Sequence, residues 1–143
     1  MSFSSRTMGE QDWDEIHYFV PGEFKFPDKM GYEFMLWLDR VRASAKVEMR
    51  ITSDYRSPQH NAEVGGAKKS SHMDVPCNVI DIGGVYEYYP EDPNWNRHRF
   101  AIIRAAMKLG CVRIGIYQNG SLHLDRTEDR RPSGLWVRVN GHP

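Results

Sequence analysis

The hydrophobic and polar positions in the first third of the chain predict one helix followed by one strand. Apolar residues recur every three or four positions up to residue 45, which is the spacing of a helix that buries one face. Asp28 precedes this pattern and can cap the helix. From Val47 to Ser53 apolar and polar residues alternate, which is typical of a half-buried strand. The positions that define the helix are Phe34, Leu38, Val41 and Ala45.

The next segment is predicted to be a short helix, a loop and a buried strand. Ser57 followed by Pro58 is typical of a helix start, because proline at the first helical position loses no hydrogen bond. Glycines 65–66 can end this helix in a left-handed conformation. Residues 68–76 are expected to form a loop, and the apolar run 78–82 predicts a short buried strand.

A second long helix is predicted after this strand. Asn94 or Asn96 can cap it, and it continues through Leu109 until Gly110 ends it. Apolar residues at helical spacing predict its inner face. These residues are Phe100, Ile103 and Met107.

The final third of the chain is rich in predicted strands. Residues 112–117 and 121–125 are expected to pair across the two-residue turn 119–120, because Asn-Gly is a strong hairpin signal. A charged loop over 126–133 and a last strand over 135–139 follow. Helices that precede and interleave with hairpin-joined strands favour an α+β fold.

Composition indicates a soluble globular protein without a strong overall electrostatic field. Its 143 residues suit a single domain spanning 1–143, with residues 1–12 loosely held. Acidic and basic residues balance at 19 each, which argues against binding to nucleic acid. No apolar run is long enough for membrane insertion. No signal-peptide pattern begins the chain, so we expect synthesis in the cytoplasm. We also expect a monomer. Cys77 and Cys111 are expected to be ordinary thiols.

Two histidines and one aspartate carry the candidate chemistry. His72 comes shortly before Asp81, and His123 lies on the predicted return strand. Asp81 stands between Ile80 and Ile82 and should point away from the face they bury, where a carboxylate is costly unless paired or coordinated. Two imidazoles and a carboxylate suit zinc, with an open position for water. A salt bridge would satisfy Asp81 equally well, and the histidines could be ordinary polar groups.

Other polar residues could complete this site or compete with it. Asp125 lies two residues after His123, so their side chains should share a strand face. There Asp125 could reach the catalytic water, or it could simply pair with an arginine. Asp74 is a rival ligand, although an exposed loop position explains it better. Arg56, between a strand and a helix, could hold a substrate or lie on the surface. The arginines that could pair with Asp125 are Arg126, Arg130 and Arg131.

These residues belong to motifs that resemble the zinc D-Ala-D-Ala carboxypeptidase family, which includes VanX-like dipeptidases and phage L-alanyl-D-glutamate endolysins. The resemblance extends from about Phe24 to Trp136, and its motifs come in the family's order. The motifs are residues 51–58, Asn61 with 64–67, 70–72, 79–82, 114–117 and 122–125.

The resemblance implies specific roles for the candidate residues. His72, Asp81 and His123 match the zinc ligands of the family. Arg56 resembles the arginine that stabilises the developing oxyanion or holds the substrate, and Ser70 resembles a serine of the substrate pocket. The implied fold is of the Hedgehog/D,D-peptidase type, a small antiparallel sheet flanked by helices.

The implied function is hydrolysis of peptide bonds in the stem peptides of bacterial peptidoglycan, by a D,D-carboxypeptidase or an L-alanyl-D-glutamate endopeptidase. Such an enzyme would act on the cell wall after release, as a phage endolysin does, or as part of a virion. Many members carry a catalytic carboxylate three positions before the last histidine, where this chain has Gly120. Asp125 is therefore the candidate base. The same glycine supports an alternative, a non-catalytic metal-holding module of the wall or virion.

Overall fold

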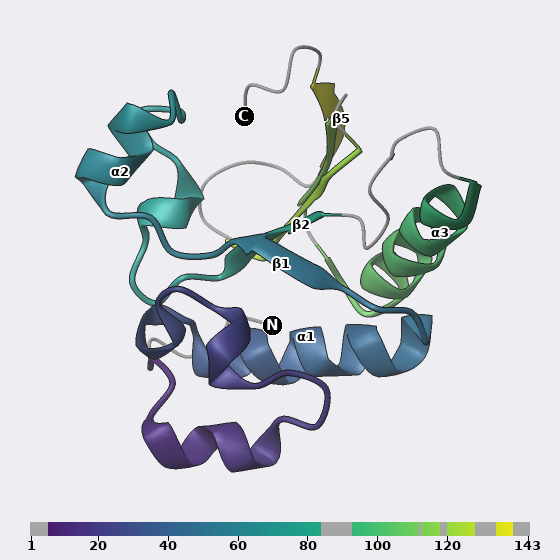
Figure 1. Ribbon diagram of the computed structural model, residues 1–143, viewed down its shortest axis with the longest axis horizontal. Coiled ribbons are helices and arrows are strands. Elements are labelled where there is room, and N and C mark those ends of the chain that lie inside the picture. The colour runs from purple at the N-terminus through teal and green to yellow at the C-terminus, as the bar shows by residue number, and fades with distance from the viewer. Residues whose placement is uncertain (1–5, 84–92, 112, 118–119, 128–133, 139–143) are drawn as a thin grey trace.

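A computed structural model describes residues 6–83, 93–111, 113–117, 120–127 and 134–138, and these form an α+β structure (Figure 1). The described strands make one sheet in the order β1-β2-β4-β3-β5. The first four pair antiparallel, as predicted, and β5 adds a parallel edge beside β3. The strands are β1 (Arg50–Ser53), β2 (Val79–Gly83), β3 (Arg113–Tyr117), β4 (Leu122–Asp125) and β5 (Gly134–Arg138). The α-helices are α1 (Tyr32–Ala45), α2 (Pro58–Glu63) and α3 (Pro93–Lys108).

Helix α1 begins later than the sequence predicts. Asp28 does not cap it, because Asp28 lies in a separate 3₁₀ turn and the helix starts at Tyr32. Gly31 is held extended between the two, and its N–H donates to the carbonyl of Cys77 at 2.9 Å. This hydrogen bond to a distant segment keeps Gly31 extended between the 3₁₀ turn and the start of α1. The predicted inner-face residues Phe34, Leu38 and Val41 are fully buried.

The segment before α1 is better ordered than expected. Residues 6–12 were expected to be loosely held, but Met8 is buried and its N–H donates to the carbonyl of Met30 at 2.8 Å. Next to this segment, the rings of Trp13 and Phe24 pack with centroids 5.4 Å apart. The segment therefore adds to the hydrophobic core.

Helix α3 buries a different face from the one predicted. It begins at Pro93, so Asn94 and Asn96 lie inside its first turn instead of capping it. Phe100 and Met107 are 69% and 62% exposed. The error arises because apolar residues occur on both sides of this helix, and small alanines mark the side that packs against α1. The buried residues are Trp95, Ile102, Ala105 and Ala106, with Ile103 half-buried beside them.

Strand β2 lies inside the sheet and separates an apolar face from a polar one. Ile80 and Ile82 are fully buried in the same core as α1 and α3. Asp81 points to the opposite face, as predicted, and its cross-strand partner on β4 is His123. In an antiparallel pair such opposed residues stand about 4.5–5.5 Å apart, so their side chains can meet.

The remaining predicted elements are confirmed with small changes. Strand β1 starts at Arg50 instead of Val47, and its register with β2 shifts before Ser53. Ser57 caps α2, because its Oγ accepts the N–H of His60 at 3.1 Å. The predicted loop over 68–76 includes a 3₁₀ turn (Ser71–Met73). None of the described helices is both long and apolar enough to cross a membrane.

The predicted hairpin joins β3 to β4, but its loop is one residue longer than predicted, because Ile116 opposes Leu122 and Tyr117 therefore opposes Ser121. Gly120 has a φ of +92°, which favours glycine, and its N–H donates to the Tyr117 carbonyl at 2.8 Å. Several predictions fall outside the described residues. They concern residues 1–5, Val112, Asn119, 128–133 (with Arg130 and Arg131) and Val139.

Candidate metal centre

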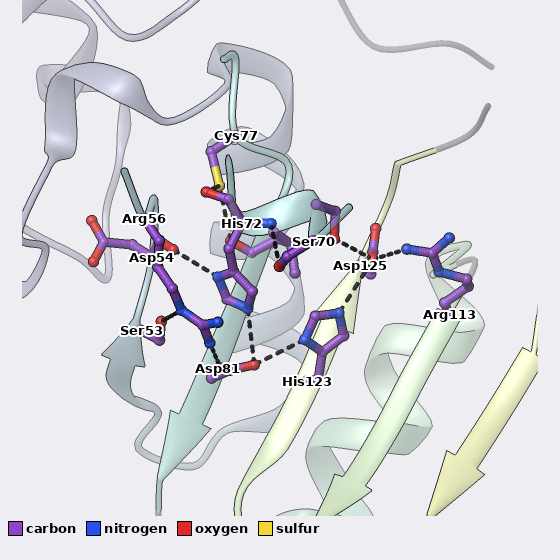
Figure 2. A network of polar contacts seen from close by, with 12 residues as sticks. Ser53, Asp54, Arg56, Ser70, His72, Cys77, Asp81, Arg113, His123 and Asp125 are labelled. Atoms are coloured by element: carbon purple, nitrogen blue, oxygen red, sulfur yellow. Dashed lines mark hydrogen bonds and ion pairs between the residues drawn. The ribbon is translucent and has the colours of Figure 1, made fainter. Parts of the chain in front are cut away.

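Three buried side chains converge on the polar face of the sheet (Figure 2). His72 comes from the 3₁₀ turn before β2, Asp81 from β2 and His123 from β4. Oδ1 of Asp81 lies 3.4 Å from Nε2 of His72 and 2.9 Å from Nδ1 of His123. One ligand atom from each residue lies within 4.8 Å of the other two. The sequence prediction that these residues meet is confirmed.

Backbone contacts fix the direction in which His72 points. Its Nδ1 lies 2.7 Å from the carbonyl oxygen of Asp54, and a carbonyl can only accept, so Nδ1–H donates. Nε2 then faces Asp81, and it is buried without a hydrogen-bond partner among the described residues. A buried nitrogen without a partner is costly, and a cation beside Asp81 would satisfy it.

His123 lies between two carboxylates. Its Nδ1 faces Asp81, and its Nε2 lies 3.2 Å from Oδ2 of Asp125. Burial lowers the pKa of His123, but its hydrogen bonds with Asp125 and Asp81 outweigh burial and raise the pKa to about 9. Burial likewise raises the pKa of Asp81, but the imidazoles of His72 and His123 hold it well below its usual range. Without a metal, a proton on His123 balances the negative charge of the two carboxylates, and a bound cation could balance that charge instead.

The three donors fit a zinc ion. Zinc binds imidazole nitrogen and carboxylate oxygen at about 2.0–2.2 Å, and tetrahedral geometry then separates ligand atoms by about 3.3–3.6 Å. The separation between His72 and Asp81 already has this value, and the 2.9 Å between His123 and Asp81 is shorter. All three donor atoms lie within 4.8 Å of one another, so side-chain shifts would be needed for them to hold one ion. Three protein ligands would leave the fourth position open, as in catalytic zinc sites.

The comparison with known proteins agrees with this geometry. A family model described as peptidase M15 matches residues 22–125, well over half of the chain, and this range contains all three converging residues. The chain belongs to the M15 peptidase family. M15 peptidases are zinc metallopeptidases, and the family resemblance inferred from the motifs is confirmed. A search of curated proteins found no match to the chain.

In this M15 peptidase, Arg56 supports one of the converging residues. Its Nη2 donates to Oδ2 of Asp81 at 3.3 Å, on the carboxylate oxygen that does not face the histidines. Its Nη1 donates to Oδ1 of Asn61 at 3.1 Å, and its Nε to Oγ of Ser53 at 3.2 Å. Arg56 is 7% exposed, so it is not a surface arginine. Each terminal nitrogen keeps a second N–H that these bonds do not use.

Gly66 completes the support of Arg56. A Cβ at Gly66 would overlap Oδ1 of Asn61, the atom that accepts from Arg56. Nδ2 of Asn61 is held in turn by the carbonyl of Ala67 at 2.8 Å. Asn61 and residues 64–67 belong to a motif of the resemblance for which the sequence alone implied no role, and in the structure they hold this arginine.

Ser70, Asp74 and Cys77 lie near the candidate metal centre in the sequence. Oγ of Ser70 accepts the N–H of His72 at 3.2 Å, so this serine caps the turn that carries the histidine. Asp74 and Cys77 lie outside the group of converging ligand atoms among the described residues. The Cys77 thiol is buried and lies 3.5 Å from the carbonyl of Val79, and burial raises its pKa far above the ordinary value. Both cysteines are free, as predicted.

Asp125 shares the strand face of His123, as predicted, but its partners include residues that the sequence analysis missed. A buried ion pair joins it to Arg113, and Ser71 donates to it at 2.9 Å. Burial raises the pKa of Asp125, but the hydrogen bonds with His123 and Thr127 and the charges of His123 and Arg113 together outweigh burial and hold the pKa below its usual range. The hairpin register places Arg113 opposite Asp125. The predicted two-residue turn would have placed Ile114 there instead, so the predicted turn did not reveal this pair. Arg126, one of the expected partners, lies over the ring of Trp37.

Proposed function

We propose that this chain is a zinc-dependent peptidase that hydrolyses peptide bonds in the stem peptides of bacterial peptidoglycan. One observation carries the proposal. Buried nitrogens of His72 and His123 face the same oxygen of Asp81, in a chain that belongs to a peptidase family. The motifs that resemble D,D-carboxypeptidases and L-alanyl-D-glutamate endopeptidases support the choice of substrate.

The residues around the centre would have different roles in hydrolysis. Zinc, when bound, supplies a Lewis acid that activates water and polarises the scissile carbonyl. His72, Asp81 and His123 would hold the ion. Arg56 keeps Asp81 oriented, and its unused N–H groups could stabilise negative charge that develops on the carbonyl oxygen. Ser70, beside His72, would help to hold the stem peptide through its hydroxyl.

Digestion of purified peptidoglycan, analysed by mass spectrometry, tests this function. The zinc-loaded protein is expected to release fragments cut at one type of stem-peptide bond, and the mass of the fragments distinguishes a carboxypeptidase from an endopeptidase. His123→Ala removes one zinc donor and should abolish cleavage. His60→Ala is the control, because His60 lies on α2 outside the converging group, and it should cleave normally. Undiminished cleavage by His123→Ala would reject the proposal.

A second candidate function is a metal-holding module that binds the cell wall or forms part of a virion without cleaving peptide. Its support is Gly120, which stands where many related enzymes carry a catalytic carboxylate. Binding of stem peptide to the zinc-loaded protein without any cleavage in the same digest would favour this function. If the protein is a peptidase, we propose that it acts as a monomer on the wall after release, without nucleic acid.

A further inference from the structure

The carboxylate of Asp125 is fully buried, and both of its oxygens are occupied. Oδ2 accepts from Nη2 of Arg113, from Oγ of Ser71 at 2.9 Å and from Nε2 of His123 at 3.2 Å. Oδ1 accepts the backbone N–H of Thr127 at 2.7 Å. The exposed fraction of Asp125 is 0%. Each carboxylate oxygen offers about two acceptor positions, so the three donors at Oδ2 leave that oxygen no position for a water.

The imidazole ring separates Asp125 from the proposed metal position. Nδ1 of His123 faces Asp81, and Nε2, on the other side of the ring, faces Asp125 (Figure 2). A general base must come within about 2.6–3.2 Å of the proton it removes. Asp125 contacts the ring nitrogen on the far side from Asp81, so its carboxylate faces the ring and not the atoms that would hold the ion.

We propose that Asp125 is a positioning residue for the metal centre and not its general base. Its carboxylate accepts the Nε2–H of His123 and so fixes the tautomer in which Nδ1 is free to bind the metal. This inference rests on the proposed zinc function. Hydrogen bonds from the second nitrogen of a metal-bound histidine to a carboxylate or carbonyl are a general means of orienting the ring.

Each of the two histidines then donates one ring N–H to a protein oxygen and presents its other nitrogen to the metal, but the two histidines use different nitrogens. His72 donates its Nδ1–H to the carbonyl of Asp54 and presents Nε2, whereas His123 donates its Nε2–H to Asp125 and presents Nδ1. Ser71 links the two arrangements, because it precedes His72 in the same turn and donates to Asp125. The turn that carries one ligand is thereby tied to the strand that carries the other.

Nitrogen NMR of the unaltered protein tests the inference directly. In zinc-loaded protein labelled with ¹⁵N-histidine, His123 is expected to carry its proton on Nε2 and to bind zinc through Nδ1, with the reverse assignment for His72. Zinc bound to His123 through Nε2 would overturn the inference while leaving the proposed function intact. Failure of the unaltered protein to bind zinc at all would instead overturn the proposed function, and the inference with it.

Zinc affinity of Asp125→Asn, measured by competition with a chromophoric chelator, gives a second test. Loss of an orienting partner is expected to weaken zinc binding by about 10–100-fold. Asp74→Asn is the matched control and should bind zinc normally, because Asp74 lies outside the converging group. A general base would show the opposite pattern, full zinc affinity with lost turnover, and that result would overturn the inference. If Asp125→Asn does not fold, Ser71→Ala is measured instead, with a weaker affinity expected and an unchanged one contradicting the proposal.

Discussion

At the scale of single residues, the centre depends on buried charges that each have a defined partner. Asp81 is 7% exposed, and its oxygens are divided between two histidines on one side and Arg56 on the other. Removing one partner from such a buried group leaves the other uncompensated, which costs far more than loss of a surface pair. Loss of Asn61 would likewise leave a buried donor of Arg56 without its acceptor.

Gly66→Ala is expected to disrupt this support without touching any proposed ligand. The added methyl group would overlap Oδ1 of Asn61, so Asn61 must move and Arg56 loses an acceptor in a buried site. We expect the free energy of unfolding, measured with urea, to fall by about 1–3 kcal/mol. Gly22→Ala is the control, because nothing lies within 4 Å of its added Cβ, and it should change stability by less than about 0.5 kcal/mol. Equal stability of both variants would contradict the described support.

At the scale of secondary-structure elements, local sequence predicted the strands and turns well and helix boundaries less well. The Asn-Gly pair identified the hairpin but predicted a loop one residue too short, and Ser57 identified the start of α2. Asp28 misled because the extended conformation of Gly31 depends on Cys77, a contact that no local pattern reveals. The predicted buried face of α3 was wrong because large apolar residues alone were used to choose it. The buried face carries alanines, which are small and let two helices approach closely.

Paired substitutions on α3 test which face is buried. Ile102 is fully buried, whereas Phe100 is 69% exposed. Ile102→Ala should lower the free energy of unfolding by about 2–5 kcal/mol, because it leaves a cavity in the core. Phe100→Ala should change it by less than about 0.5 kcal/mol in the same denaturation experiment. A larger loss from Phe100→Ala than from Ile102→Ala would show that the sequence-predicted face is the buried one.

At the scale of the whole molecule, the order of strands assembles the centre. β4 lies between β2 and β3, so Asp81 and His123 become neighbours although they are far apart in the sequence. Family motifs identified the three converging residues, but composition and spacing left alternatives for each. The supporting residues were harder to predict, because the partnerships of Ser71 and Arg113 with Asp125 depend on how distant segments pack.

The most direct test of the central claim is the zinc content of the purified protein, measured by elemental analysis after removal of excess metal. We expect one zinc ion per chain, lost in both His72→Ala and Asp81→Ala and retained in His60→Ala. Absence of zinc from the folded unaltered chain, or full zinc content in His72→Ala, would contradict the claim that His72, Asp81 and His123 form a metal centre.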